Sequence, residues 1–252
     1  MPANTLFMGH KLVLVPECHS TNDEAQRLLQ QKGSADGLVV ITANQTAGRG
    51  QRGNTWFSEP GKNLTFSIGL KPHFLNPKMQ FYLSMAVSLG LLDGLTSLLP
   101  EAEVKVKWPN DMMLNGKKTC GILIENQLMG LLLDRSVVGV GLNVNQLSFS
   151  MATATSLAKE AGHAFDLNDV LSLLLEKLEA RYLLVKAEEF ERLKYDYEHH
   201  LYWRDAVHDF IVNEQPVSGI IEGVSEEGKL EVLLDGTHRQ FAFKEISYGY
   251  TK

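Results

Sequence analysis

A glycine- and arginine-rich segment between two predicted strands constrains the fold most strongly. Residues 46–56 read Thr-Ala-Gly-Arg-Gly-Gln-Arg-Gly-Asn-Thr-Trp. Glycine lets a ligand approach main-chain N–H groups, and the arginine fork suits carboxylate and phosphate oxygens. A β-branched run at 38–42 precedes the segment and an alternating run at 63–70 follows it, so both flanks are predicted strands. Walker-type and dinucleotide-binding loops are therefore disfavoured, because they require a helix directly after the glycines.

Composition and charge narrow the alternatives for this segment, which include a plain surface turn and an arginine–glycine grip on nucleic acid. The chain has 252 residues, 44% of them hydrophobic and 21% charged, with a formal net charge of −6. These fractions are typical of a soluble globular protein, and an acidic chain is a poor candidate for broad binding to nucleic acid. The length allows one large domain, or a large domain and a small one.

The cysteine count and the apolar runs predict a cytoplasmic protein. Cys18 and Cys120 are the two cysteines, too few for a Cys-rich zinc site or a disulfide framework. The first ten residues lack the basic region and long apolar core of a secretory signal. The richest apolar run, 128–140, contains Gly130 and charged residues, so no membrane-spanning segment is expected.

Hydroxyl and amide residues precede the first predicted helix. Ser20, Thr21 and Asn22 follow a short strand at 12–15 and come before a helix-forming stretch. Such residues usually cap a helix, which is the favoured interpretation, and they also bind polar ligands at helix N-termini.

The longer helices are predicted to form the core. Asn76-Pro77 starts a helix, and residues 80–99 are apolar on all sides, as in a buried helix. Asp166 is expected to cap an amphipathic helix that runs to about Lys186, and residues 188–200 form another. His199 and His200 point in different directions in a helix, which favours a plain surface over a metal site.

The segment 104–125 is the second dense signal. An alternating strand ends at Trp108-Pro109 and is followed by Asn110 and Asp111. Asn115-Gly116 is the favoured two-residue hairpin turn. Lys117 and Lys118 are then either exposed turn residues or, for one of them, a cation that points toward the Arg49 loop.

A predicted strand at 137–145 carries glycines at alternate positions. Gly139, Gly141 and Asn143 share one face of it. Glycine weakens a strand unless another group must approach the backbone. A packing contact and room for a flat ligand explain this pattern equally well.

From about residue 201 the sequence consists of short predicted strands separated by turns such as Asp235-Gly236. We therefore predict an α+β fold, with a mixed sheet flanked by helices over residues 1–200. A small SH3-like β-barrel domain is expected over residues 201–252.

The ordered set of these segments resembles the successive motifs of biotin protein ligases. The residues that carry the resemblance are Ser20-Thr21-Asn22, Gln45 to Gly53 with Trp56, Lys107 to Asp111, Lys118 to Leu123, and Gly139 to Asn143. The resemblance covers nearly the whole chain and implies a class II synthetase-like catalytic domain. Because Ser20 comes so early, it also implies the short form without an N-terminal DNA-binding domain, and no binding to DNA.

The resemblance implies a two-step reaction. Biotin and ATP, with Mg²⁺ expected, give biotinyl-5′-AMP, and a lysine of a biotin carboxyl carrier protein of acetyl-CoA carboxylase or a similar enzyme then attacks the adenylate. Rival functions are a lipoate or octanoate ligase or transferase of the same superfamily and a non-catalytic biotin-sensing regulator. The sequence leaves open whether the protein is a homodimer.

The resemblance also implies the site residues. Lys118 and Arg49 are expected to be catalytic, with Lys117 as the spare lysine, and no metal ligands are assigned. The residues expected at biotin are Ser20, Thr21, Asn22, Gln45, Gly48, Arg49, Gly50, Gln51, Trp56, Lys118 and Gly121. The residues expected at ATP are Arg52, Trp56, Asn110, Asp111, Lys118, Gly139, Gly141 and Asn143.

One position departs from the family pattern. The family loop often reads Gly-Arg-Gly-Arg-Arg-Gly, whereas this chain has Gln51 in place of the second arginine. The loop thereby loses one charge, and we expect the enzyme to retain its adenylate intermediate less tightly.

Overall fold

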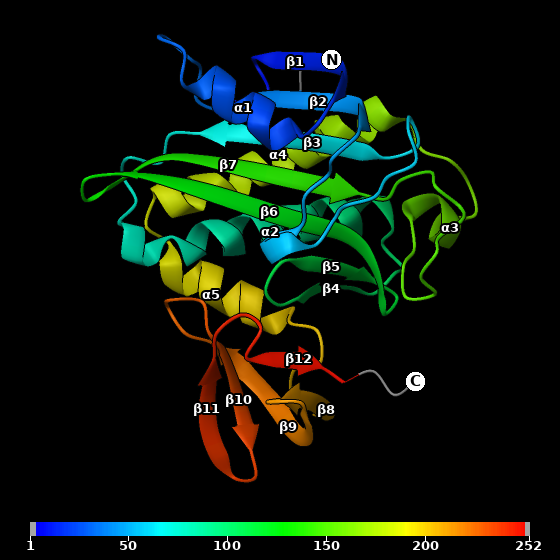
Figure 1. The fold of residues 1–252 in the computed structure, drawn as a ribbon, viewed down its shortest axis with the longest axis vertical. Helices are drawn as coiled ribbons and strands as arrows, with labels where there is room; N and C mark the ends of the chain where they lie inside the picture. Colours follow the sequence, from blue (N-terminus) through cyan, green and yellow to red (C-terminus); the bar gives the residue numbers. More distant parts are fainter. Residues whose placement is uncertain (1–3, 250–252) are drawn as a thin grey trace.

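A computed structural model describes residues 4–249, apart from the side chain of Arg52. Its larger part is a seven-stranded sheet in the order β1-β2-β3-β7-β6-β5-β4, with β1 parallel to β2 and the other pairs antiparallel (Figure 1). The strands are β1 (Leu12–Cys18), β2 (Leu38–Gln45), β3 (Leu64–Leu70), β4 (Val104–Lys107), β5 (Asp111–Leu114), β6 (Lys117–Met129) and β7 (Leu132–Leu142). The predicted mixed sheet is confirmed.

Helices cover both faces of this sheet. The α-helices are α1 (Thr21–Leu29), α2 (Phe81–Leu98), α3 (Leu157–Ala161), α4 (Leu167–Lys186) and α5 (Phe190–His199). Helix α1 buries Ala25 and Leu29 against Leu38 and Val40 of β2. Val39, whose side chain points to the opposite face, belongs to the larger core that includes α2 and α4.

Local structure follows the sequence with small shifts. Pro77–Met79 form a 3-10 turn before α2, so the helix predicted from Asn76-Pro77 begins later, at Phe81. Asp166 caps α4 by accepting from the N–H groups of Asn168 and Asp169. Positive φ angles of 48° and 74° at Asn115 and Gly116 confirm the predicted hairpin turn.

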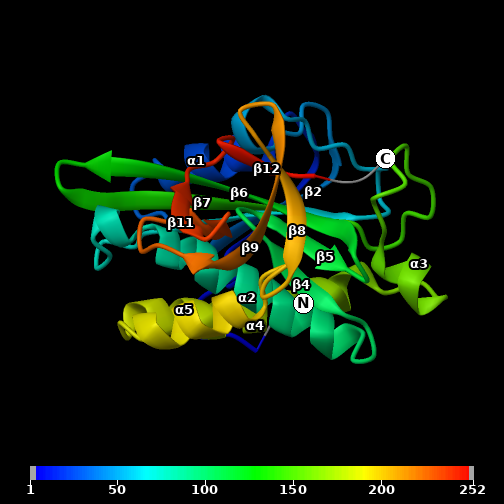
Figure 2. The same ribbon diagram turned by 90° about the horizontal axis from the view of Figure 1, so that it is seen from below.

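The second sheet is antiparallel and open. Its strands are β8 (Val207–Val212), β9 (Gln215–Val224), β10 (Leu230–Leu234), β11 (Thr237–Phe241) and β12 (Ile246–Tyr248), in the order β11-β10-β9-β8-β12. The predicted small β domain is therefore present as an antiparallel sheet, and within residues 4–249 β11 and β12 do not pair to close it into a barrel (Figure 2).

The helix that is apolar enough to span a membrane is not the segment that the sequence suggested as the richest apolar run. Residues Pro77–Leu98 are long and apolar enough to cross a bilayer, whereas the sequence singled out 128–140 as the richest run. In the structure 67% of the helix's most apolar stretch lies buried inside the protein. This helix forms part of the hydrophobic core that packs against the seven-stranded sheet.

Candidate functional site

A cavity of about 380 Å³ opens where the loop between β2 and β3 crosses the strands β6 and β7. It collects residues from separate parts of the sequence between Ser20 and Tyr248. Its lining is Ser20, Thr21, Asn22, Gln45, Arg49, Gly50, Gln51, Asn54, Thr55, Trp56, Thr65, Lys107, Trp108, Pro109, Asn110, Asp111, Lys118, Gly121, Ile122, Leu123, Gly139, Val140, Gly141, Phe243, Ile246, Ser247 and Tyr248. A concave site with a few converging polar groups is the usual form of a small-molecule site.

The first wall of the cavity is the N-terminus of α1. Ser20 occupies the N-cap position, but its side chain makes no capping hydrogen bond, so the favoured interpretation of a simple side-chain cap is wrong. Gln45 of β2 takes that role, because its Oε1 accepts from the N–H of Thr21 at 2.9 Å. Ser20, Thr21 and Asn22 are all buried. Hydroxyl and amide groups therefore face the cavity from one side.

The glycine- and arginine-rich loop folds over the cavity as a small closed turn. Gly50 donates to the carbonyl of Asn54 at 2.7 Å, and Trp56 donates to the carbonyl of Gly48 at 2.9 Å. The loop joins two strands as predicted, with only a 3-10 turn at Gln51–Gly53. It thus lies within reach of both ends of the cavity.

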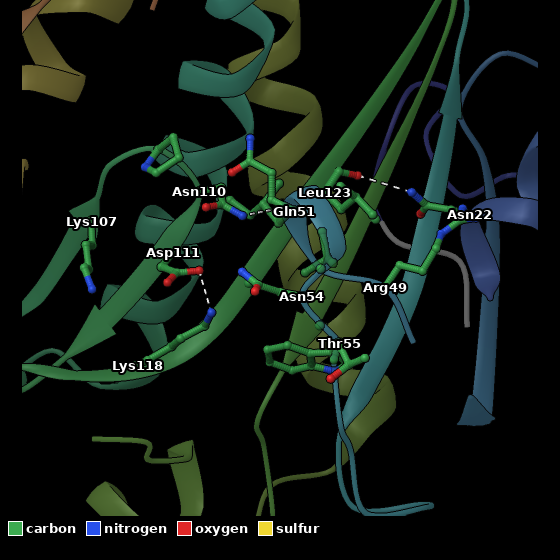
Figure 3. A pocket seen from close by; sticks show the side chains of 18 of the residues that line it. Asn22, Arg49, Gln51, Asn54, Thr55, Lys107, Asn110, Asp111, Lys118 and Leu123 are labelled. Carbon is green, nitrogen blue, oxygen red and sulfur yellow. Dashed lines mark hydrogen bonds and ion pairs between the residues drawn. The ribbon is translucent and has the colours of Figure 1, made fainter. Parts of the chain in front are cut away.

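The two predicted catalytic cations are held by carboxylates at opposite sides of the cavity (Figure 3). Nη2 of Arg49 lies 2.7 Å from Asp23 and 3.1 Å from Glu125. Nζ of Lys118 lies 2.7 Å from Oδ1 of Asp111. The sequence interpretation treats both cations as acting on the same charges, whereas the structure separates them.

The structure distinguishes the neighbouring lysines. Lys117 is exposed, whereas Lys118 is half-buried and lines the cavity. Lys107 lines it as well, and burial lowers the pKa of this lysine, opposed by the nearby charge of Asp111. Lys107 was not among the predicted site residues. Its place directly before the Trp108-Pro109 pair was the available signal.

The alternate glycines of β7 make room for side chains of the protein. A Cβ on Gly139 would collide with Oδ1 of Asn22, and a Cβ on Gly141 would collide with the indole ring of Trp56. Gly121 of β6 also lies against the indole ring, because a Cβ added at Gly121 would lie 3.2 Å from a ring carbon of Trp56. The packing contact is therefore present, and both glycines of β7 also line the cavity.

Two predicted site residues, Asn143 and Gly48, do not line the cavity. Asn143 lies beyond the end of β7, where its Nδ2 donates to the carbonyl of Thr155 at 3.0 Å, so its amide fastens a neighbouring loop. Gly48 lies beside the loop, where an added Cβ would meet Nε2 of Gln45. The side chain of Arg52 lies outside the described part of the structure. The other predicted residues come together around the cavity.

The second sheet contributes a wall that sequence reasoning missed. Phe243, Ile246, Ser247 and Tyr248 line the cavity, although they lie about 100 residues beyond Gly141 in the sequence. Nε1 of Trp108 donates to the carbonyl of Gly228 at 2.9 Å. No local pattern identifies this wall, because it depends on how the two sheets meet.

The described residues contain no group of three or more His, Cys, Asp or Glu side chains that could hold a metal ion. Asp111 is the one carboxylate among the described residues that line the cavity. Asp111 can supply a carboxylate oxygen to a hard cation. Waters and substrate phosphates usually supply most of the remaining ligands.

A mixed sheet with helices on both faces, and a pocket that joins hydroxyl and amide groups to several cations, define an α+β domain for a small, polar, negatively charged ligand. The chain belongs to the biotin/lipoate A/B protein ligase family, whose model matches residues 15–143. This finding confirms the family resemblance of the motifs.

Relatives with curated names support the same membership. The chain is 33% identical over 224 residues to the biotin–[acetyl-CoA-carboxylase] ligase of Mycobacterium tuberculosis, covering 87% of this chain and 82% of the relative. It is 32% identical over 183 residues to the bifunctional ligase/repressor BirA of Bacillus spizizenii, covering 71% of this chain. It spans 55% of that relative's length.

A solved structure extends the similarity to both sheets. The biotin protein ligase from Aquifex aeolicus in complex with biotin and ATP has a TM-score of 0.77 and 26% sequence identity, covering 96% of this chain and 100% of the other. The small C-terminal sheet is therefore part of the shared fold.

Proposed function

We propose that this chain is a biotin protein ligase, which activates biotin with ATP and transfers it to a lysine of a biotin carboxyl carrier protein. The observation that carries the proposal is one cavity that joins the hydroxyl and amide wall at Ser20–Asn22 to the cations Lys118 and Lys107. A polar ring with a carboxylate tail needs both kinds of group. The relatives' names and the Aquifex aeolicus complex point to the same ligands.

The first step joins biotin to the nucleotide. A carboxylate oxygen of biotin attacks the α-phosphorus of ATP, and the bond from that phosphorus to the bridging oxygen breaks, so that pyrophosphate leaves with the electron pair. Two anions repel one another, and fixed cations aimed at the developing charge lower the barrier. Lys118 is the proposed cation at this centre, and it exchanges Asp111 for the reacting anions.

The second step transfers the biotinyl group. The neutral amine of the carrier lysine attacks the acyl carbon of biotinyl-5′-AMP, the bond to the phosphate oxygen breaks, and AMP leaves. The amine loses a proton in forming the amide. Arg49 is the second proposed cation, and it must first leave Asp23 and Glu125, which hold it in the structure.

The nucleotide is expected to arrive with Mg²⁺. This ion usually takes one or two carboxylates together with substrate phosphates and waters. Asp111 fits the first part of that requirement, since it lines the cavity beside Lys118. When bound, the ion would neutralise charge on the polyphosphate.

We further propose that residues 1–200 form the catalytic unit and residues 201–252 a second unit that covers the nucleotide end of the cavity. Phe243 and Tyr248 support this division of labour, because they line the cavity beside Lys107 and Trp108. The carrier partner would approach from the open side of the cavity. The two free cysteines suit a reducing, cytoplasmic setting.

Transfer of labelled biotin to a carrier domain, with ATP and Mg²⁺, tests the proposal. The wild type should label the carrier, and Lys118→Ala should reduce the rate by at least about 100-fold, as for loss of a group that stabilises transition-state charge. Lys117→Ala is the matched control, because this exposed neighbour should leave the rate unchanged. Labelling of the carrier with lipoate in place of biotin would overturn the substrate assignment.

A further inference from the structure

A chain of hydrogen bonds runs behind the hydroxyl and amide wall of the cavity. It passes from Glu125 of β6 through Asn22 of α1 and Ser67 of β3 to Thr21, whose backbone N–H donates to Gln45 of β2. Ser67 is fully buried and does not line the cavity. The members of this chain therefore set how the wall presents its donors and acceptors.

The orientation of the Asn22 amide is fixed by acceptors. Its Nδ2 lies 2.7 Å from a carboxylate oxygen of Glu125 and 3.4 Å from the carbonyl oxygen of Leu123. A carboxylate and a carbonyl can only accept, so the NH₂ group must face them. The amide oxygen of Asn22 consequently faces Ser67, at 2.6 Å.

The direction of the next two protons follows from this orientation. The Ser67 hydroxyl has a single proton, and it goes to Oδ1 of Asn22, which can only accept. Oγ of Ser67 also lies 2.7 Å from Oγ1 of Thr21. Since Ser67 has no second proton, the hydroxyl of Thr21 donates to Ser67, the nearer acceptor at 2.7 Å, and not to Oε1 of Gln45 at 3.3 Å.

The end of the chain faces the cavity with a defined pattern. With its proton committed to Ser67, the hydroxyl of Thr21 has only lone pairs left for a ligand. Oε1 of Gln45 accepts from the N–H of Thr21 at 2.9 Å, which turns the NH₂ group of Gln45 away from Thr21. The wall thus presents the hydroxyl of Thr21 as an acceptor, while Nε2 of Gln45 lies beside Gly48.

We propose that Glu125 and Ser67 are positioning residues that determine specificity, because they hold Thr21 as an acceptor toward the cavity. The wall then selects a ring that offers an N–H, as a cyclic urea does. It rejects rings without an N–H, such as a dithiolane, because a buried acceptor left unpaired is costly. This inference rests on the proposed function and extends it to residues that do not touch the ligand.

Asp23 provides a matched control for the charge of Glu125. Asp23 and Glu125 both pair with Arg49, at 2.7 and 3.1 Å, but only Glu125 also accepts from Asn22. Glu125→Gln replaces one acceptor oxygen by a donor, so the Asn22 amide can turn over and reverse every proton behind it. Asp23→Asn removes a charge beside Arg49 and leaves the chain of hydrogen bonds from Glu125 to Thr21 intact.

The experiment measures the affinities of biotin, desthiobiotin and lipoate by calorimetry for wild type, Glu125→Gln, Ser67→Ala and Asp23→Asn. Desthiobiotin keeps the urea, whereas lipoate has a dithiolane. We expect Glu125→Gln and Ser67→Ala to weaken biotin and desthiobiotin together by about 10-fold, the size of one lost hydrogen bond in a buried site. Lipoate should bind as weakly to these variants as to wild type, and Asp23→Asn should keep the wild-type ratio of biotin to lipoate affinity.

Thermal unfolding of each variant separates a loss of ligand affinity from misfolding. We expect the midpoint of thermal unfolding to be unchanged in Glu125→Gln. A wild-type affinity ratio in Glu125→Gln would overturn the proposal, and so would an equal loss in Asp23→Asn, which would assign the effect to Arg49. Wild-type protein that binds neither biotin nor desthiobiotin would instead overturn the proposed function, and this inference with it.

Discussion

At the level of single residues, the protein's own side chains occupy the space that glycines leave in β6 and β7. The amide of Asn22 lies over Gly139, and the indole of Trp56 lies over Gly141. The indole N–H of Trp56 has no hydrogen-bond partner among the described residues, although it is buried. The glycines thereby fix the two walls of the cavity in place.

Gly139→Ala should disturb the ligand-binding wall at its support. The new methyl group would collide with Oδ1 of Asn22, so the amide must move and its bond to Ser67 is lost. We expect the affinity for biotin to fall by at least about 10-fold, measured by calorimetry. Gly141→Ala, the same change two residues along the strand, should instead alter the fluorescence of Trp56. Equal loss of biotin affinity in both variants, with no change in fluorescence, would contradict this assignment.

Gln51→Arg tests the departure from the family loop. The substitution adds a cation to a loop that lines the cavity, and a guanidinium suits phosphate oxygens. We expect biotinyl-5′-AMP to dissociate more slowly from the variant, by about 10-fold for one charge-assisted hydrogen bond. Stopped-flow release of the intermediate measures this rate. An unchanged rate would show that the loop charge does not retain the adenylate, and Gln51→Lys would show whether charge alone suffices.

At the level of elements, one buried arginine fastens three helices together. Arg181 of α4 bonds both carboxylate oxygens of Asp93 in α2, at 2.7 and 3.1 Å, and Asp196 in α5 at 2.5 Å. Its side chain is only 16% exposed. Hydrogen bonding to Asp93 is the main cause that raises the pKa of Arg181 above its usual value, and an arginine guanidinium is charged in proteins in any case.

Arg181→Met should destabilise the helical layer strongly. The substitution leaves two half-buried carboxylates without their cation, and breaking such a pair costs about 3 kcal/mol of the free energy of unfolding. Urea unfolding measures the loss. Arg27→Met is the control, because Arg27 pairs with Glu24 on the surface, where its side chain is 60% exposed, and such pairs contribute less than about 1 kcal/mol. Similar losses in the two variants would contradict the special role of the clamp.

Periodicity predicted the elements well, because each depends on a local pattern. The all-round apolar run became the buried helix α2, and Asn115-Gly116 became the tight turn of a hairpin. Periodicity could not predict which side chains contact one another. That Asn22 fills the space at Gly139, and that Ser67 lies behind the site, depends on strands that are distant in sequence and meet only in the folded sheet.

At the level of the whole molecule, the two sheets share one hydrophobic core. Ile221 and Phe210 of the second sheet belong to the same cluster of buried residues as Phe66 and Val138 of the first. The cavity also draws its walls from both sheets. A boundary near residue 200 therefore separates two sheets in sequence, and the shared core predicts that they unfold together.

Ile221→Ala tests this cooperativity. Ile221 is fully buried in β9, and truncating such a residue costs about 2–5 kcal/mol of the free energy of unfolding. Because the core is shared, hydrogen exchange should accelerate in β3 and β7 as well as in β8 to β12, measured by mass spectrometry of peptides under native conditions. Val207→Ala lies in the same sheet, at a side chain that is 66% exposed. It should change neither the free energy of unfolding nor the rates of hydrogen exchange. Faster exchange confined to residues 207–248 in Ile221→Ala would show that the second sheet opens independently, and that the cavity can lose one wall while the other stays folded.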